Sequence, residues 1–131
     1  MYPHCRILVI DDNCDVADAL GMMLSIEGHT VQIANSGHEA LVLADRYVPD
    51  IAFLDIGMPE MDGYEVAGLL REKLSAKPPL LVALSGYGSA LDRERSRAAG
   101  FDAHVTKPLD ISKLRDLVDQ ACSTQSSRTR Q

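Results

Sequence analysis

The sequence contains no tryptophan, and aromatic residues make up only 5% of its 131 positions. We therefore expect a core built from aliphatic side chains. No apolar run approaches the ~18 residues that are typical of a membrane-spanning helix, so we expect no insertion into a membrane. The first residues also lack the apolar segment and cleavage site of a secretory signal. These absences favour a cytoplasmic protein.

Cysteine and basic charge are scarce as well. The three cysteines, Cys5, Cys14 and Cys122, are far apart and form no C-x-x-C pair. This pattern favours reduced thiols over a disulfide framework or a zinc site. The formal net charge is -6, which argues against direct binding to nucleic acid or to an anionic membrane.

Short apolar runs alternate with segments of helical period along the whole chain. We expect strands over residues 6–10, 30–34, 51–54, 80–84 and 102–106, and helices near 14–27, 37–47, 63–74, 90–99 and 111–122. Each connection is long enough for a right-handed parallel crossover. The prediction is an α/β fold with a doubly wound, five-stranded parallel sheet and five helices. Residues 1–122 would form one domain, and the polar residues 123–131 a disordered tail or a linker.

Charged and hydroxyl side chains follow four of the five predicted strands: Asp11 and Asp12, Asp55, Ser85 and Lys107. The carboxyl ends of parallel strands share one edge, and adjacent strands are about 4.8 Å apart, so these side chains should converge. Three close carboxylates repel one another unless protons or a cation neutralise them. Hard oxygen ligands favour Mg²⁺. One carboxylate could then attack a phosphoryl group while the metal and Lys107 neutralise its charge.

Four motifs stand at strand ends in a fixed order: Asp11-Asp12, Asp55-x-x-Met58-Pro59-x-x-Asp62-Gly63, Ser85-Gly86 and Lys107-Pro108. With them the chain resembles the receiver domain of two-component response regulators over roughly residues 5–122. The resemblance implies a flavodoxin-like fold. It also implies phosphorelay signalling, in which a phosphoryl group changes the conformation that a partner recognises.

The resemblance implies a role for each carboxylate. Asp55 resembles the phosphoacceptor, which takes a phosphoryl group from a histidine kinase or a histidine phosphotransfer domain. Asp12 resembles the direct Mg²⁺ ligand, and Asp11 its partner acting mainly through water. Asp55 and the backbone carbonyl of Gly57 would complete the protein ligands. Mn²⁺ can substitute for Mg²⁺ in such a site.

The remaining matches concern the phosphoryl group and the loops around it. Lys107 resembles the lysine that pairs with Asp55 and then with the phosphoryl oxygens, and Ser85, followed by Gly86, resembles the switch hydroxyl. His104 stands where many receivers carry a switch aromatic, so the coupling between hydroxyl and aromatic would be altered. The structural positions are Pro59, Gly63 and Pro108, the last usually preceded by a cis peptide bond in this family.

Two other functions remain open from the sequence. A Mg²⁺-dependent phosphohydrolase would typically need a second acid two residues after Asp55, where Gly57 stands, and a cap over the substrate. A degenerate receiver could serve only as a binding module, although all the acids, Ser85 and Lys107 are present. The downstream partner is either a separate protein or an attached output or kinase domain. Residues 83–86 and 100–104 are similar to receivers of hybrid sensor kinases.

Overall fold

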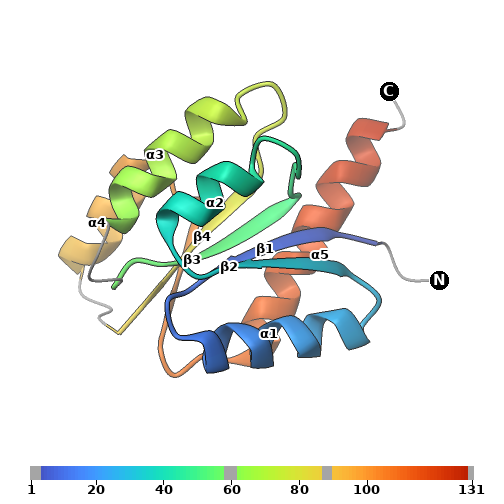
Figure 1. Ribbon diagram of the computed structural model, residues 1–131, viewed down its shortest axis with the longest axis horizontal. Helices are drawn as coiled ribbons and strands as arrows, with labels where there is room; N and C mark the ends of the chain where they lie inside the picture. Colours follow the sequence, from blue (N-terminus) through green and yellow to red (C-terminus); the bar gives the residue numbers. More distant parts are fainter. Residues whose placement is uncertain (1–3, 58–61, 87–89, 130–131) are drawn as a thin grey trace.

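The computed structural model describes residues 4–57, 62–86 and 90–129, and five parallel strands form its centre (Figure 1). The strands lie in the order β2-β1-β3-β4-β5. This order confirms the predicted doubly wound, flavodoxin-like sheet, in which ligands bind outside the carboxyl ends of the strands. The strands are β1 (Arg6–Ile10), β2 (Thr30–Ala34), β3 (Ile51–Asp55), β4 (Leu80–Ser85) and β5 (Ala103–Thr106).

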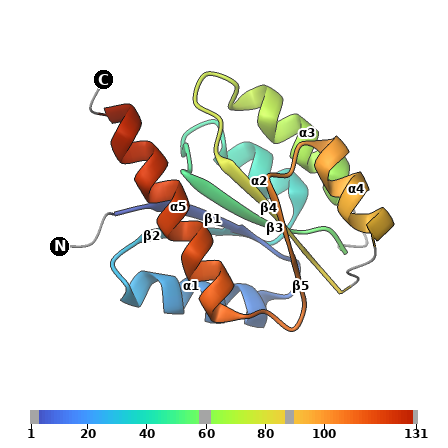
Figure 2. The ribbon, with the colours of Figure 1, turned by 180° about the vertical axis from the view of Figure 1, so that it is seen from behind.

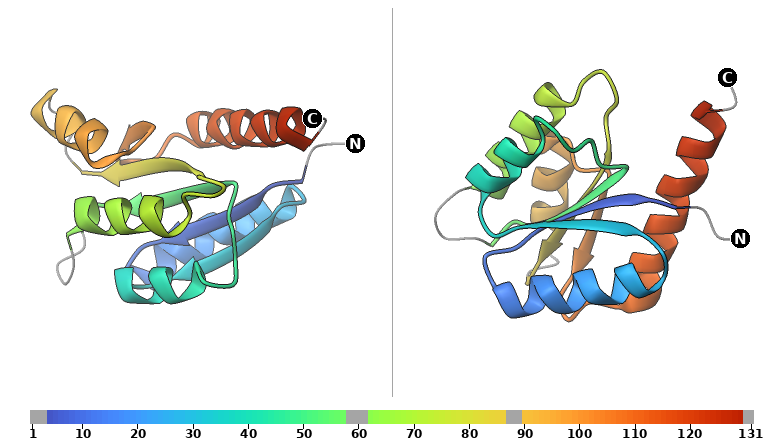
Figure 3. Two further views of the ribbon diagram at one scale, coloured as in Figure 1. Left: turned by 90° about the horizontal axis from the view of Figure 1, so that it is seen from above. Right: turned by 45° about the vertical axis from the view of Figure 1, so that its right-hand side comes forward.

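Five helices cover the two faces of this sheet (Figure 3). One core cluster joins the sheet to α2, α3 and the end of α4, and the other joins it to α1 and α5. Helices α1 and α5 lie on this second face (Figure 2). Arg115 of α5 lies 2.5 Å from the Glu27 carboxylate at the end of α1. The helices are α1 (Cys14–Ile26), α2 (Gly37–Leu43), α3 (Gly63–Lys73), α4 (Ala90–Ala99) and α5 (Ile111–Thr129).

Strand β3 is buried along its whole length, which explains why its sequence does not alternate between apolar and polar residues. Ala52 and Leu54 pack into the cluster beneath α2 and α3, whereas Ile51 and Phe53 pack into the cluster beneath α1 and α5. The apolar run then ends in Asp55, the last residue of the strand. A strand held on both faces therefore carries this carboxylate.

Apolar residues recur in α1 at Val16, Leu20, Met23 and Leu24, a period that predicts one buried face, but the helix is rotated from this face in the structure. Val16 is 36% exposed, and Ala17 and Gly21 are buried instead, together with Leu20 and Leu24. A Cβ on Gly21 would lie 3.0 Å from the Cδ1 atom of Ile33. The small residues thus let α1 approach β2 closely, and this contact sets the rotation of the helix.

Two predicted helix ends differ from the structure. Helix α2 ends at Leu43 rather than near Tyr47, whose hydroxyl lies 2.9 Å from the carbonyl oxygen of Thr30 and 3.1 Å from that of Ile7. These contacts hold Tyr47 beneath the sheet edge, where a continued helix would not place it. Helix α5 continues to Thr129 instead of ending near Cys122, so residues 123–129 are helical where we predicted disorder. No glycine or proline interrupts them, and a helix extends readily once nucleated.

None of the helices in the described ranges is long and apolar enough to span a membrane.

Candidate functional site

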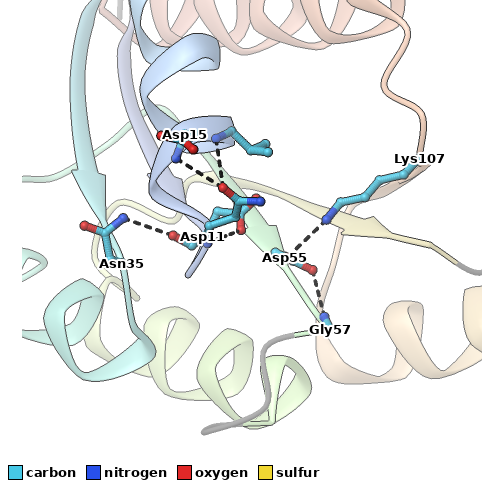
Figure 4. A network of polar contacts seen from close by, with 8 residues as sticks. Asp11, Asp15, Asn35, Asp55, Gly57 and Lys107 are labelled. Carbon is cyan, nitrogen blue, oxygen red and sulfur yellow. Dashed lines mark hydrogen bonds and ion pairs between the residues drawn. The ribbon is translucent and has the colours of Figure 1, made fainter.

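Three carboxylates meet at the carboxyl edge of the sheet, as the sequence predicts, and Figure 4 shows two of them, Asp11 and Asp55. Asp11 and Asp12 follow β1, and Asp55 ends the neighbouring strand β3. One oxygen of each can be chosen so that all three lie within 4.8 Å of one another. Asp11 and Asp55 are buried, whereas Asp12 is exposed to solvent. The cluster thus reaches solvent through Asp12.

The backbone around the acidic pair is held from both neighbouring segments. The amide nitrogen of Asp11 donates to the carbonyl oxygen of Ala34 at 3.1 Å, and the Asn35 side chain donates to the carbonyl oxygen of Asp11 at 3.1 Å. Asn13 caps α1 by accepting hydrogen bonds from the amides of Asp15 and Val16. The sequence interpretation missed both asparagines, although Asn13 directly before a helical segment is a typical N-cap.

Asp11 lacks one of the partners that a buried carboxylate needs. Its Oδ1 accepts a hydrogen bond from the Asn13 amide at 3.0 Å, but within the described ranges Oδ2 has no partner. Burial raises the pKa of Asp11, and the nearby charge of Asp55 raises it further against the lowering effect of the Asn13 amide. An unpartnered buried oxygen beside two more carboxylates fits a hard divalent cation such as Mg²⁺.

The two oxygens of Asp55 have separate partners (Figure 4). Oδ1 accepts a hydrogen bond from the Gly57 amide at 2.8 Å, and Oδ2 lies 3.1 Å from Nζ of Lys107. Lys107 follows β5, and its backbone nitrogen donates to the carbonyl oxygen of Ser85 at 2.7 Å. Its ammonium therefore reaches Asp55 across the end of β4. The Lys107–Pro108 peptide bond is cis, as predicted.

Ser85 ends β4 and contacts the histidine of the neighbouring strand. Its Oγ lies 2.6 Å from Nε2 of His104, and Nδ1 of the same ring lies 3.1 Å from Oγ of Ser96 in α4. The ring thus joins the end of β4 to a helix. Ser96 is 2% exposed, and nothing in the sequence singled it out.

The glycines and prolines around the site differ in how closely other residues pack against them and in whether the structure describes them. A Cβ on Gly63 would lie 2.7 Å from the Cα atom of Ile56, so this position requires glycine for close approach of α3 to the segment after β3. Asp62 caps the same helix through the amide of Tyr64. Gly86 is exposed, with open space where a Cβ would be. Pro59 lies outside the described residues, and the proposed ligand role of the Gly57 carbonyl stays a prediction.

The amino-acid sequence matches a known family. The model of the response regulator receiver domain matches residues 7–119. The chain belongs to this family. Its receiver fold and its place in two-component signalling follow from that membership.

Individual relatives agree with the family assignment. The chain is 40% identical over 116 residues to an uncharacterized 14.6 kDa protein in the sodA1 3′ region of Leptolyngbya boryana, covering 88% of each chain. It is 38% identical over 108 residues to the transcriptional regulatory protein KdpE of Mycobacterium tuberculosis, where the match covers 82% of this chain but only 46% of that protein.

A solved structure resembles the whole fold. It is the co-crystal structure of the Saccharomyces cerevisiae histidine phosphotransfer signaling protein Ypd1 and the receiver domain of its downstream response regulator Ssk1. The match has a TM-score of 0.87 at 22% identity and covers 95% of this chain and 93% of the other. At this identity the likeness concerns the fold.

Proposed function

We propose that this receiver accepts a phosphoryl group on Asp55 from a phosphohistidine of a histidine kinase or a histidine phosphotransfer domain. The observation that carries the proposal is the pairing of Asp55 with Lys107 at 3.1 Å beside two further carboxylates. An anionic nucleophile next to a cation, in a cluster that needs further positive charge, is suited to transfer of a phosphoryl group.

The reaction needs little more than positioning and charge neutralisation. One oxygen of Asp55 attacks the phosphorus, the P–N bond to the donor histidine breaks, and its electron pair returns to the imidazole. Mg²⁺, or Mn²⁺ in its place, would neutralise charge on the transferring oxygens, held by Asp11, Asp12, Asp55 and the carbonyl of Gly57. Lys107 moves from the carboxylate to the phosphoryl oxygens. Water later hydrolyses the aspartyl phosphate, so the protein catalyses only its own phosphorylation and dephosphorylation.

Helix α1 supports a phosphodonor protein as the partner. It starts directly after the acidic pair, and it exposes the apolar side chains of Met22 and Ile26 to 66% and 79%. The Ssk1 receiver, which has the same fold, forms a complex with a histidine phosphotransfer protein. Because α1 begins beside the edge that carries Asp55, a partner packed along the whole length of the helix would also lie next to that edge.

The phosphoryl group would act as a switch through its charge. It adds nearly two negative charges and three acceptor oxygens beside Lys107 and Ser85. Because Ser85 bonds His104 on β5 and His104 bonds Ser96 on α4, a movement of Ser85 alters the face formed by α4, β5 and α5. The partner that recognises this change is a separate downstream protein or an output or kinase domain attached to the chain.

Incubation with acetyl phosphate and Mg²⁺, followed by intact mass measurement, tests the proposal. We expect a gain of one phosphoryl group that requires Mg²⁺ and is absent in Asp55→Ala. Wild-type protein that gains no phosphoryl group would instead support a binding module. Continuous turnover of unrelated phosphoesters would support a phosphohydrolase.

A further inference from the structure

The ring of His104 is a hydrogen-bonded bridge between the candidate site and helix α4. Its Nε2 lies 2.6 Å from Oγ of Ser85, at the end of β4, and its Nδ1 lies 3.1 Å from Oγ of Ser96. Both serines are buried, at 3% and 2% exposure. Ser96 belongs to α4, so a buried hydroxyl on a helix holds the ring that contacts the site.

The chemistry of the three groups limits how the protons can be arranged. A neutral imidazole carries one N–H, so one ring nitrogen donates and the other accepts. A serine inside a helix can donate its proton to the carbonyl oxygen one turn earlier, and its oxygen then accepts from other donors. In that arrangement Nδ1–H of His104 donates to Ser96, and the unprotonated Nε2 accepts the proton of Ser85.

We propose that Ser96 is a positioning residue that selects this tautomer of His104 and thereby keeps the hydroxyl proton of Ser85 directed at the ring. The inference rests on the proposed phosphorylation of Asp55. Phosphoryl oxygens only accept hydrogen bonds, and Ser85 has a single proton to donate. The phosphoryl group must therefore compete with His104 for that proton, and Ser96 strengthens the competitor.

A cavity beside the ring gives the His104 side chain room to move when Ser85 turns away from it. A cavity of about 150 Å³ lies between α4 and β5, lined by Ser96, Arg97, Phe101, Asp102, Ala103 and His104. When Ser85 turns toward the phosphoryl group, the ring can tautomerise, with the proton leaving Nδ1 and one arriving at Nε2, or it can rotate toward this cavity. Rotation breaks the bond to Ser96, and tautomerisation leaves Nδ1 without a proton to donate to Ser96, so either change alters the contact between His104 and α4 when Ser85 moves.

The first test concerns the unphosphorylated protein. Ser96→Thr keeps the hydroxyl, whereas Ser96→Val has nearly the same volume without it, so their difference removes the effect of packing. Nitrogen-15 NMR spectra of the His104 ring should show the Nδ1–H tautomer in wild type and in Ser96→Thr. Ser96→Val should show a larger population of Nε2–H. An Nε2–H ring in the wild type, or identical tautomer populations in the two variants, would overturn the proposal.

The second test measures phosphorylation with acetyl phosphate and Mg²⁺. The loss of one hydrogen bond should raise the steady-state ratio of phosphorylated to unphosphorylated protein about fivefold in Ser96→Val relative to Ser96→Thr. In a His104→Phe background the two variants should give the same ratio, because Ser96 acts through the ring. An equal change in both backgrounds, or no change in either, contradicts the proposal. If the wild type takes up no phosphoryl group, the proposed function fails while the tautomer measurement still decides this inference.

Discussion

Asp11 and Asp50 are both buried aspartates of the central sheet, but their carboxylates have different surroundings. Asp50 precedes β3 at the amino edge of the sheet, where its Oδ2 accepts a hydrogen bond from the amide of Arg6 at 2.8 Å. Its backbone nitrogen donates to the carbonyl oxygen of Arg6 at 2.7 Å, and its carbonyl oxygen accepts from the amide of Leu80 at 3.0 Å. Asp50 therefore joins the starts of β1, β3 and β4.

The carboxyl edge is arranged in the opposite way. Within the described ranges, two buried side-chain oxygens lack a hydrogen-bond partner, Oδ2 of Asp11 and Oγ1 of Thr106, and both lie at this edge. At the amino edge Asp102 repeats the pattern of Asp50, since its Oδ2 accepts from the amide of Leu81 at 2.8 Å. The sheet thus uses satisfied carboxylates for structure at its amino edge, whereas at its carboxyl edge Asp11 keeps one oxygen unsatisfied.

The largest expected effect separates the two edges by function. Asp55→Asn should abolish the Mg²⁺-dependent uptake of a phosphoryl group from acetyl phosphate, because an amide nitrogen or oxygen cannot form the aspartyl phosphate. Asp50→Asn, the matched change at the amino edge, should retain the uptake. Intact mass measurement of both variants checks this. Phosphorylation of Asp55→Asn at unchanged level would show that another residue is the acceptor.

The next largest effect distinguishes the two edges of the sheet by their contribution to the free energy of unfolding. Asp50→Ala removes the acceptor of the buried Arg6 amide, so the free energy of unfolding should fall by about 2 kcal/mol. Asp12→Ala changes an exposed carboxylate and should alter the free energy of unfolding by less than about 0.5 kcal/mol in the absence of metal. Urea denaturation of the two variants provides the comparison. Equal losses would mean that both edges depend on their carboxylates for folding.

Addition of Mg²⁺ should have a smaller effect, confined to the carboxyl edge. At a concentration about five times the dissociation constant, a bound cation should stabilise the wild type by about 1 kcal/mol. This gain should disappear in Asp12→Asn and persist in Asp50→Asn. Thermal unfolding with and without Mg²⁺ measures it. A gain that survives in Asp12→Asn would place the cation elsewhere.

Much of the carboxyl edge could be predicted because its position follows from topology. Parallel strands place their ends together, so Asp11, Asp55 and Lys107 converge once the strands are identified. Strand β3 could be identified because all its residues before Asp55 are apolar. The same logic located Ser85, which ends the strand between Asp55 and Lys107.

The contacts made by helices could not be predicted in the same way. The apolar period of α1 suggested that Val16 is buried, but the rotation of the helix depends on the fit of Gly21 against Ile33. Ser96 lies on a mostly polar helix, and its contact with His104 depends on how α4 packs on β5. Such contacts arise from the shapes of two elements far apart in sequence, which neither element specifies alone.

The smallest expected difference between the two edges concerns how fast their cysteines are alkylated at a given pH. Cys14 is exposed near the acidic pair, whereas Cys5 and Cys122 are buried in the cluster beneath α5. Burial raises the pKa of both buried thiols above the ordinary value of 9.0. Because their pKa values lie above 9.0, Cys5 and Cys122 should remain mainly protonated at pH 9.0. Only the thiolate reacts with iodoacetamide, so both should react slowly.

Cys14 should therefore react faster than either buried thiol at pH 8, because it is exposed whereas burial keeps Cys5 and Cys122 protonated and out of reach of the reagent. Peptide mapping after timed alkylation measures the three rates. Urea at a concentration that unfolds the protein serves as the control, because it should bring the rates together. Asp50→Ala should also speed the reaction of Cys5, which lies next to Arg6, because the lost hydrogen bond makes opening of this edge easier. Fast alkylation of Cys5 in the folded wild type would show that the amino edge opens as readily as an exposed site, and that its satisfied hydrogen bonds do not hold it closed.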